Sequence, residues 1–190
     1  WPIQAARALG LELTSLAFAG NAMLDPFVAR VIAEQPADLI TLKVGINPVN
    51  GDAFRRRTFL PALHGFLDTV RDGHPSTLIV VITALACPIH EDATGPTHEV
   101  SPGRAGATPR DIPEGDGSLT LRRTREYVKQ VVSLRQAEDA HLTVLSGLDL
   151  LGLDDEGCLP DALHPDQEGH DRIARRFIER LEHHTVRLRL

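Results

Sequence analysis

Short apolar runs alternate with amphipathic segments along most of this chain, and this order constrains the fold more than any other feature. The apolar runs span residues 11–18, 38–44, 78–85 and 141–145, and the amphipathic segments span residues 2–9, 25–34, 55–72, 118–137 and 166–181. Runs this short suit strands, and the segments between them have helical spacing. The pattern predicts an α/β domain with a parallel sheet, in which the very apolar run LIVVITAL is a central strand.

The length of 190 residues suits one domain over residues 1–190, with one excursion. Residues 86–117 are rich in Pro and Gly, lack periodicity and contain few apolar side chains. Loops of this length inside a compact domain are generally functional or disordered. We therefore expect the excursion to contribute to a binding site.

Composition excludes several classes of partner. The chain has 20 basic and 26 acidic side chains, a net charge of −6, which disfavours nucleic acid or an anionic membrane as the main partner. No apolar run approaches the roughly 20 residues of a membrane-spanning helix. The arginines cluster in helical segments, which predicts solvated helix faces, with an anionic substrate as the alternative; they are Arg55, Arg56, Arg57, Arg122, Arg123, Arg125, Arg175 and Arg176.

The two cysteines, Cys87 and Cys158, are too few for a disulfide framework and too far apart for a metal motif. We expect two inert thiols. His90, His98, His164 and His170 invite a metal-site interpretation, but no tight ligand pattern such as H-E-x-x-H is present. The sequence therefore predicts neither a metal nor a cofactor.

Ligands of a doubly wound sheet bind beyond the carboxyl ends of its strands, so the segments after each strand are where chemistry is expected. Two of these segments place a glycine near an asparagine, Gly20 with Asn21 and Gly45 with Asn47. A glycine lets its N–H approach a ligand, and an asparagine amide is a second donor, so such a pair suits a developing oxyanion. The alternative is ordinary turn chemistry.

The segment LPDALHPDQEGH places Asp161 three residues before His164, next to Pro165 at the expected start of a helix. A carboxylate bonded to one ring nitrogen fixes the imidazole tautomer and leaves the other nitrogen free to accept a proton. The alternative is a turn aspartate followed by a polar helix cap. Either role fits this spacing.

The stretches AFAGNAMLDP, LKVGINPVN and LPDALHPDQEGH, in this order, resemble the second, third and fifth sequence blocks of the SGNH/GDSL hydrolase superfamily. The strings ITLKVGIN, GFLDTVRDGHP and SLTLRR extend the resemblance over nearly the whole chain. It implies a three-layer α/β/α fold of flavodoxin-like type. It also implies ester hydrolysis through a serine acyl-enzyme without a cofactor.

The resemblance assigns roles by position. His164 would be the general base and Asp161 its orienting partner, while the Gly20 N–H and the Asn47 side chain would bind the oxyanion. Gly45 would shape the turn that carries Asn47. Many members have an aspartate after this asparagine, whereas Pro48 stands here.

The first block of the family, which carries the nucleophilic serine, has no counterpart in these residues. Each serine of the chain has an ordinary strand, turn, loop, cap or helix position, so none is the expected nucleophile. We expect the serine and its strand to lie upstream of Trp1. In the strand order 2-1-3-4-5 that strand is central, so its absence predicts a gap in the sheet that upstream residues or another copy of the chain would fill.

The expected substrate is a small-molecule ester. The excursion is polar and makes a poor acyl-chain groove, which favours a short, acetyl-like acyl group on a carbohydrate or other polar scaffold. Two alternatives remain: a non-catalytic binding module that keeps the fold without a nucleophile, and a metal-dependent hydrolase.

Overall fold

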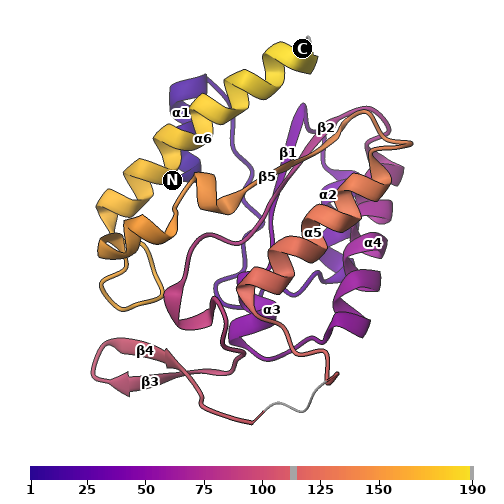
Figure 1. Ribbon diagram of the computed structural model, residues 1–190. Helices are drawn as coiled ribbons and strands as arrows, with labels where there is room; N and C mark the ends of the chain where they lie inside the picture. Colours follow the sequence, from indigo (N-terminus) through magenta and orange to yellow (C-terminus); the bar gives the residue numbers. More distant parts are fainter. Residues whose placement is uncertain (112–114, 189–190) are drawn as a thin grey trace.

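The protein contains a parallel three-stranded sheet, seen in a computed structural model that describes residues 1–111 and 115–188, with side chains as far as Leu181. The strands are β1 (Leu39–Lys43), β2 (Leu78–Ile82) and β5 (Leu142–Leu145), in the order β1-β2-β5. Every residue of β2 is buried, which confirms its central place. The predicted α/β fold with a parallel sheet flanked by helices is confirmed (Figure 1).

Helices cover both faces of the sheet because alternate residues of each strand point to opposite sides. Helices α2 (Pro26–Glu34), α4 (Arg56–Gly73) and α5 (Leu121–Arg135) form one core with the side of β2 that carries Ile79 and Val81. Helices α1 (Pro2–Leu9) and α6 (Gln167–Leu188) form the other core, with Leu78, Val80 and Ile82. In the described part of the chain, no helix has the length and apolar character needed to cross a bilayer.

Local sequence signals account for several helix ends. Pro26 starts α2 directly after Asp25, and α1 ends at Gly10, whose φ of 67° is left-handed. Helix α5 begins three residues later than the amphipathic segment 118–137 predicts, because Thr120 is its cap and accepts the Arg123 N–H at 3.3 Å. The Ser118 hydroxyl instead donates to Asp116, because the chain is still extended there and forms a bridge with Arg55.

The predicted strand over residues 11–18 is wrong. This segment has no regular secondary structure, and all eight of its residues are exposed, including Leu11 and Phe18. A strand needs a neighbour to satisfy its backbone N–H and C=O groups. The described residues supply β1 with one neighbour, β2, and offer the 11–18 segment none. The edge of β1 that faces away from β2 therefore has no strand partner among the described residues.

The excursion over residues 86–117 contains regular structure that its composition did not predict. Strands β3 (Thr97–Ser101) and β4 (Arg104–Ala107) form an antiparallel hairpin at the same end of the molecule as the short helix α3 (Ile46–Asn50). The backbone ladder and the Gly103 turn hold this hairpin, so it needs no apolar face. Short 3₁₀ helices occupy residues Pro88–His90, Gly147–Asp149 and Leu153–Cys158, and residues 112–114 of the excursion lie outside the described residues.

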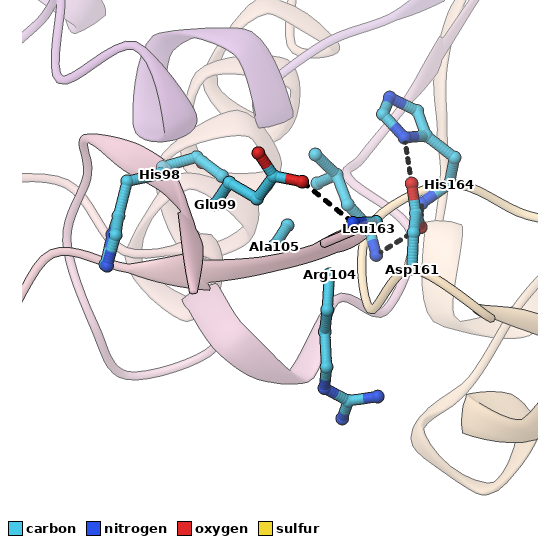
Figure 2. Close-up of a pocket in the computed structure, with 9 residues that line it drawn as sticks. His98, Glu99, Arg104, Ala105, Asp161, Leu163 and His164 are labelled. Carbon is cyan, nitrogen blue, oxygen red and sulfur yellow. Dashed lines mark hydrogen bonds and ion pairs between the residues drawn. The ribbon is translucent and has the colours of Figure 1, made fainter. Parts of the chain in front are cut away.

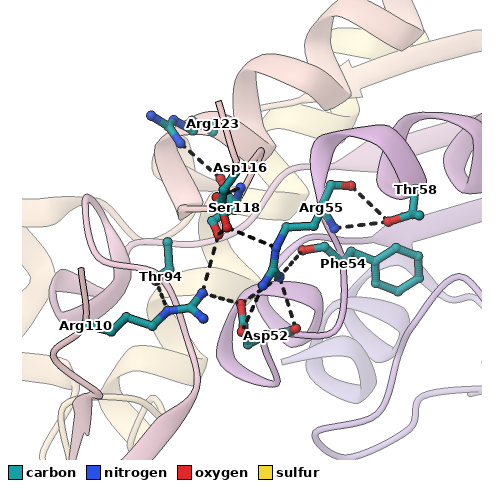
Figure 3. Close-up of polar contacts among 9 residues, drawn as sticks. All are labelled: Asp52, Phe54, Arg55, Thr58, Thr94, Arg110, Asp116, Ser118 and Arg123. Atoms are coloured by element: carbon teal, nitrogen blue, oxygen red, sulfur yellow. Dashed lines mark hydrogen bonds and ion pairs between the residues drawn. The ribbon is translucent and has the colours of Figure 1, made fainter. Parts of the chain in front are cut away.

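The C-terminal part of the excursion is fastened to the loop that follows α3 (Figure 3). Arg110 donates to Asp52 at 2.8 Å, and Arg55 pairs with both Asp52 and Asp116. Gly95 packs directly on α3, where an added Cβ would lie 2.0 Å from the Val49 carbonyl oxygen. The excursion is therefore part of the structure that holds α3 in place.

Candidate active site

Asp161 and His164 form a hydrogen-bonded pair in the loop before α6. The Oδ2 atom of Asp161 lies 2.6 Å from Nδ1 of His164, and its Oδ1 atom accepts the backbone N–H groups of His164 at 2.6 Å and Leu163 at 2.9 Å (Figure 2). A carboxylate at Nδ1 favours the tautomer with the proton on that nitrogen. The His164 side chain is 75% exposed, which leaves Nε2 accessible as a proton acceptor.

The surroundings of Asp161 keep its carboxylate ionised. Burial raises the pKa of Asp161, but the hydrogen bonds from the His164 N–H, the His164 ring and the Leu163 N–H together outweigh burial and lower the pKa to about 2. Because the folded-state pKa lies below the unfolded value, the resulting stabilisation is present above about pH 4 and is lost as the pH falls through about 2.

Replacing His164 with alanine should raise the pKa of Asp161 from about 2 toward the usual value of about 3.9. The change removes the ring donor and its charge, while the two backbone donors stay and keep the pKa somewhat depressed. Titration of the Asp161 carboxyl carbon by NMR measures this shift. Asp92, which pairs with Arg122, is the internal reference and should titrate as before. An unchanged Asp161 pKa would show that the ring does not interact with the carboxylate.

A hydrogen bond joins Asn47 to the segment that carries Gly20. The backbone N–H of Ala22, two residues after Gly20, donates to Oδ1 of Asn47 at 3.0 Å. This contact occupies the amide oxygen of Asn47 and leaves its NH₂ group available as a donor. Gly20 itself has a φ of 70°. The structure thus joins the segment after residues 11–18 to the segment after β1.

Gly45 has a conformation that a larger residue would not adopt. Its φ is 120°, and an added Cβ would meet Thr124 Oγ1 at 3.3 Å and Ala84 Cβ at 3.5 Å. The chain can therefore turn beside α5 as it leaves β1. Helix α3 starts directly afterwards, at Ile46, and carries Asn47. The resemblance implies a turn-shaping role for Gly45, and this conformation is compatible with it.

A pocket of about 360 Å³ lies beside His164, between its loop and the β3–β4 hairpin. The hairpin forms one wall of this pocket, and the Ala105 N–H of β4 donates to the Asp161 carbonyl at 2.9 Å. In Figure 2 the side chains of His98 and Arg104 point away from the imidazole. The lining residues are Thr97, His98, Glu99, Gly103, Arg104, Ala105, Asp161, Leu163 and His164. Gly20 and Asn47 are absent from this lining, and the structure brings only Asp161 and His164 of the four predicted residues into direct contact.

Sequence reasoning missed the hairpin and the buried Arg125. The helix spacing could have revealed Arg125, because it falls on the same stripe as Leu121, Val128 and Val132, which are all buried. The prediction of solvated arginine faces is confirmed for Arg56, Arg57, Arg122, Arg123 and Arg175, which are exposed. It is wrong for Arg125, which is buried because Glu91 and two carbonyls replace water around its guanidinium.

The other candidate ligands have local partners. His90 is buried, with Nε2 2.6 Å from Thr97 Oγ1, and Nδ1 of His170 lies 3.4 Å from the Trp1 amino nitrogen. Among residues 1–111 and 115–181, no three His, Cys, Asp or Glu side chains are placed to hold a metal ion together. Burial raises the pKa of both Cys87 and Cys158, which suits thiols that stay protonated.

Comparison with solved structures places the fold. The chain is 32% identical to the salicylyl-acyltransferase SsfX3 from a tetracycline biosynthetic pathway, with a TM-score of 0.74 over 93% of this chain and 46% of that one. A putative GDSL-like lipase from Bacteroides ovatus is 25% identical, with a TM-score of 0.64 over 93% of this chain and 44% of that one. The chain thus spans less than half the length of these two proteins.

A carbohydrate esterase of family 3 from Talaromyces cellulolyticus shares the fold at 14% identity, with a TM-score of 0.60 over 96% of this chain and 88% of that one. Neither protein-family models nor curated proteins match the chain. The parallel sheet, its two helical layers and these structural matches lead to one conclusion: the chain has the fold of the SGNH/GDSL hydrolases and is similar to members of that family.

Proposed function

We propose that this chain is the catalytic domain of a serine ester hydrolase that removes a short, acetyl-like acyl group from a carbohydrate or other polar scaffold. The observation that carries the proposal is the Asp161–His164 pair, joined at 2.6 Å, with the exposed His164 side chain at the edge of the pocket. Thr97 and Glu99 of the hairpin line that pocket and offer hydrogen-bonding groups to a polar scaffold. The carbohydrate esterase among the structural matches agrees with it.

In the proposed mechanism, Nε2 of His164 accepts the proton of a serine hydroxyl as the serine oxygen attacks the ester carbonyl. The Asp161 carboxylate stabilises the imidazolium that forms. The Gly20 N–H and the Asn47 NH₂ donate to the oxyanion. His164 then gives its proton to the departing alcohol, and the same base activates water to release the acyl group as a carboxylic acid.

We assign the nucleophilic serine to a segment outside these 190 residues that adds a strand to the free edge of β1. Within the described chain no serine lines the pocket beside His164 or hydrogen-bonds to its ring. The unpaired edge of β1 and the exposed 11–18 segment beyond Gly10 support this assignment. A parallel strand at that edge would end near α3, close to Asn47.

Acyl-chain preference tests the substrate class. With the full-length natural protein, kcat/KM for chromogenic esters should fall as the acyl chain lengthens from acetyl to octanoyl, because the pocket offers a long chain little apolar surface to bury. Product analysis with an added sugar alcohol separates hydrolysis from acyl transfer, since water or an alcohol can attack the same acyl-enzyme. Faster turnover of octanoate than of acetate would sink the short-acyl proposal.

A non-catalytic binding module is the second candidate, and the absence of a serine from the described pocket favours it. Such a module would bind an acetylated sugar without turnover, even in the full-length protein. Binding of an acetylated sugar measured by calorimetry, without any ester hydrolysis by the same protein, would support this candidate over the esterase.

A further inference from the structure

Arg125 of α5 is buried, at 5% exposure, and all its contacts run toward the carboxyl end of β2. Its Nη1 and Nη2 atoms donate to the two carboxylate oxygens of Glu91, each at 2.6 Å. Its Nε donates to the Ala84 carbonyl at 2.8 Å, and Nη2 also donates to the Leu85 carbonyl at 2.9 Å. The rigid guanidinium fork thus fixes the position of Glu91 relative to the end of β2.

The fixed Glu91 carboxylate in turn binds the backbone of Cys87. Its Oε1 atom accepts the Cys87 backbone N–H at 3.1 Å. The Cys87 thiol in turn donates to the Ala162 carbonyl at 3.6 Å. Burial, followed by the nearby charge of Glu91, raises the pKa of this thiol to about 12, so it is a hydrogen-bond donor at neutral pH.

The Ala162 backbone needs such support. Its φ is 68°, in the left-handed region that is unfavourable for a non-glycine residue. The hairpin holds the carbonyl of Asp161 through Ala105, and Cys87 holds the carbonyl of Ala162 itself. This turn brings the His164 ring back over the Asp161 carboxylate (Figure 2).

We propose that the buried Arg125–Glu91 pair, acting through Cys87, positions the turn that holds Asp161 and His164 together. Arg125, Glu91 and Cys87 are then positioning residues, and none of them touches the substrate. The consequence for catalysis rests on the proposed function, whereas the consequence for the geometry of the His164 ring does not.

Two variants test whether Arg125 acts on the Asp161–His164 turn through Cys87. Arg125→Lys keeps the charge but loses the fork, and Cys87→Ala removes the thiol donor alone. NMR of protein labelled with ¹⁵N in histidine reports the Nδ1–H proton of His164 and its exchange with water. We expect this exchange to accelerate about tenfold or more in each variant, with kcat reduced similarly and KM nearly unchanged. Cys87→Ser keeps a donor and should restore part of both properties.

The double variant Arg125→Lys/Cys87→Ala distinguishes a chain of contacts from two separate defects. If Arg125 acts through Cys87, the second substitution adds little to the change in Nδ1–H exchange. Arg122→Lys is the matched control, because it lies on the same helix and its pair with Asp92 is exposed.

The outcomes separate the two proposals. A His164 signal that stays unchanged in both single variants, while the free energy of unfolding falls, would overturn the positioning role and leave the pair purely structural. Faster Nδ1–H exchange in the variants, together with no ester hydrolysis by the full-length wild-type protein, would support the positioning role and refute the esterase. Additive effects in the double variant would overturn the route through Cys87.

Discussion

Replacing His164 with alanine in the full-length natural protein should lower kcat/KM for an acetyl ester by about 10³-fold or more. The imidazole is the proposed acceptor of the serine proton, and without it the serine attacks as a neutral hydroxyl. Asp161→Asn should cost a similar factor, because an amide at that position no longer fixes the tautomer or stabilises the imidazolium. Steady-state kinetics with a chromogenic acetyl ester measures both losses.

His141→Ala is the control for this experiment, since His141 is exposed at the start of β5, and its backbone N–H, not its ring, bonds to Asp139. It should retain full activity. A His164→Ala protein that folds normally and hydrolyses acetyl esters within a few-fold of the wild type would contradict the assignment of His164 as the base.

Arg125→Met should lower the free energy of unfolding by about 3–5 kcal/mol, because it breaks a buried ion pair. The change leaves the Glu91 carboxylate buried at 7% exposure without its cation. It also removes the donors that satisfy the Ala84 and Leu85 carbonyls. Denaturant unfolding followed by circular dichroism gives the difference from the wild type.

Arg122→Met is the matched substitution three residues earlier in the same helix. Arg122 is 57% exposed in its pair with Asp92, so the same chemical change should alter the free energy of unfolding by less than about 1 kcal/mol. The double variant Arg125→Met/Glu91→Met should recover much of the loss, because it leaves no buried charge unpaired. If Arg122→Met and Arg125→Met lowered the free energy of unfolding equally, the buried pair would contribute no more to stability than the exposed one.

The parts of the fold that the sequence predicts well have strong local signals. Pro2 and Gly10 mark the two ends of α1, and Pro26 marks the start of α2. The unbroken apolar run of β2 predicts a strand buried on both faces. These features depend on residues that are near one another in the chain, which is why a single sequence reveals them.

The failures of prediction depend on contacts that are distant in sequence. Residues 11–18 have strand-like composition, but the described chain offers them no neighbouring strand. The β3–β4 hairpin forms without an apolar alternation because the backbone ladder holds it. Arg125 looks like part of a solvated charge run until Glu91, 34 positions away in the sequence, is seen to pair with it.

The candidate site shows the same division. The spacing of Asp161 and His164 is readable in the sequence, and so is the placement of Asn47 after a strand. The left-handed Ala162 and the hairpin's hold on Asp161 are visible only in three dimensions. Sequence therefore suggests which groups could react, and the structure adds what holds them in place.

Labelling of the full-length natural protein with a fluorophosphonate, a probe that reacts with activated serines, tests the central claim most directly. Peptide mass mapping then locates the labelled residue. The account predicts one modified serine, in a segment outside these 190 residues, and much slower labelling in His164→Ala. Absence of any labelled serine, or a label on a serine within the chain such as Ser101, would contradict it.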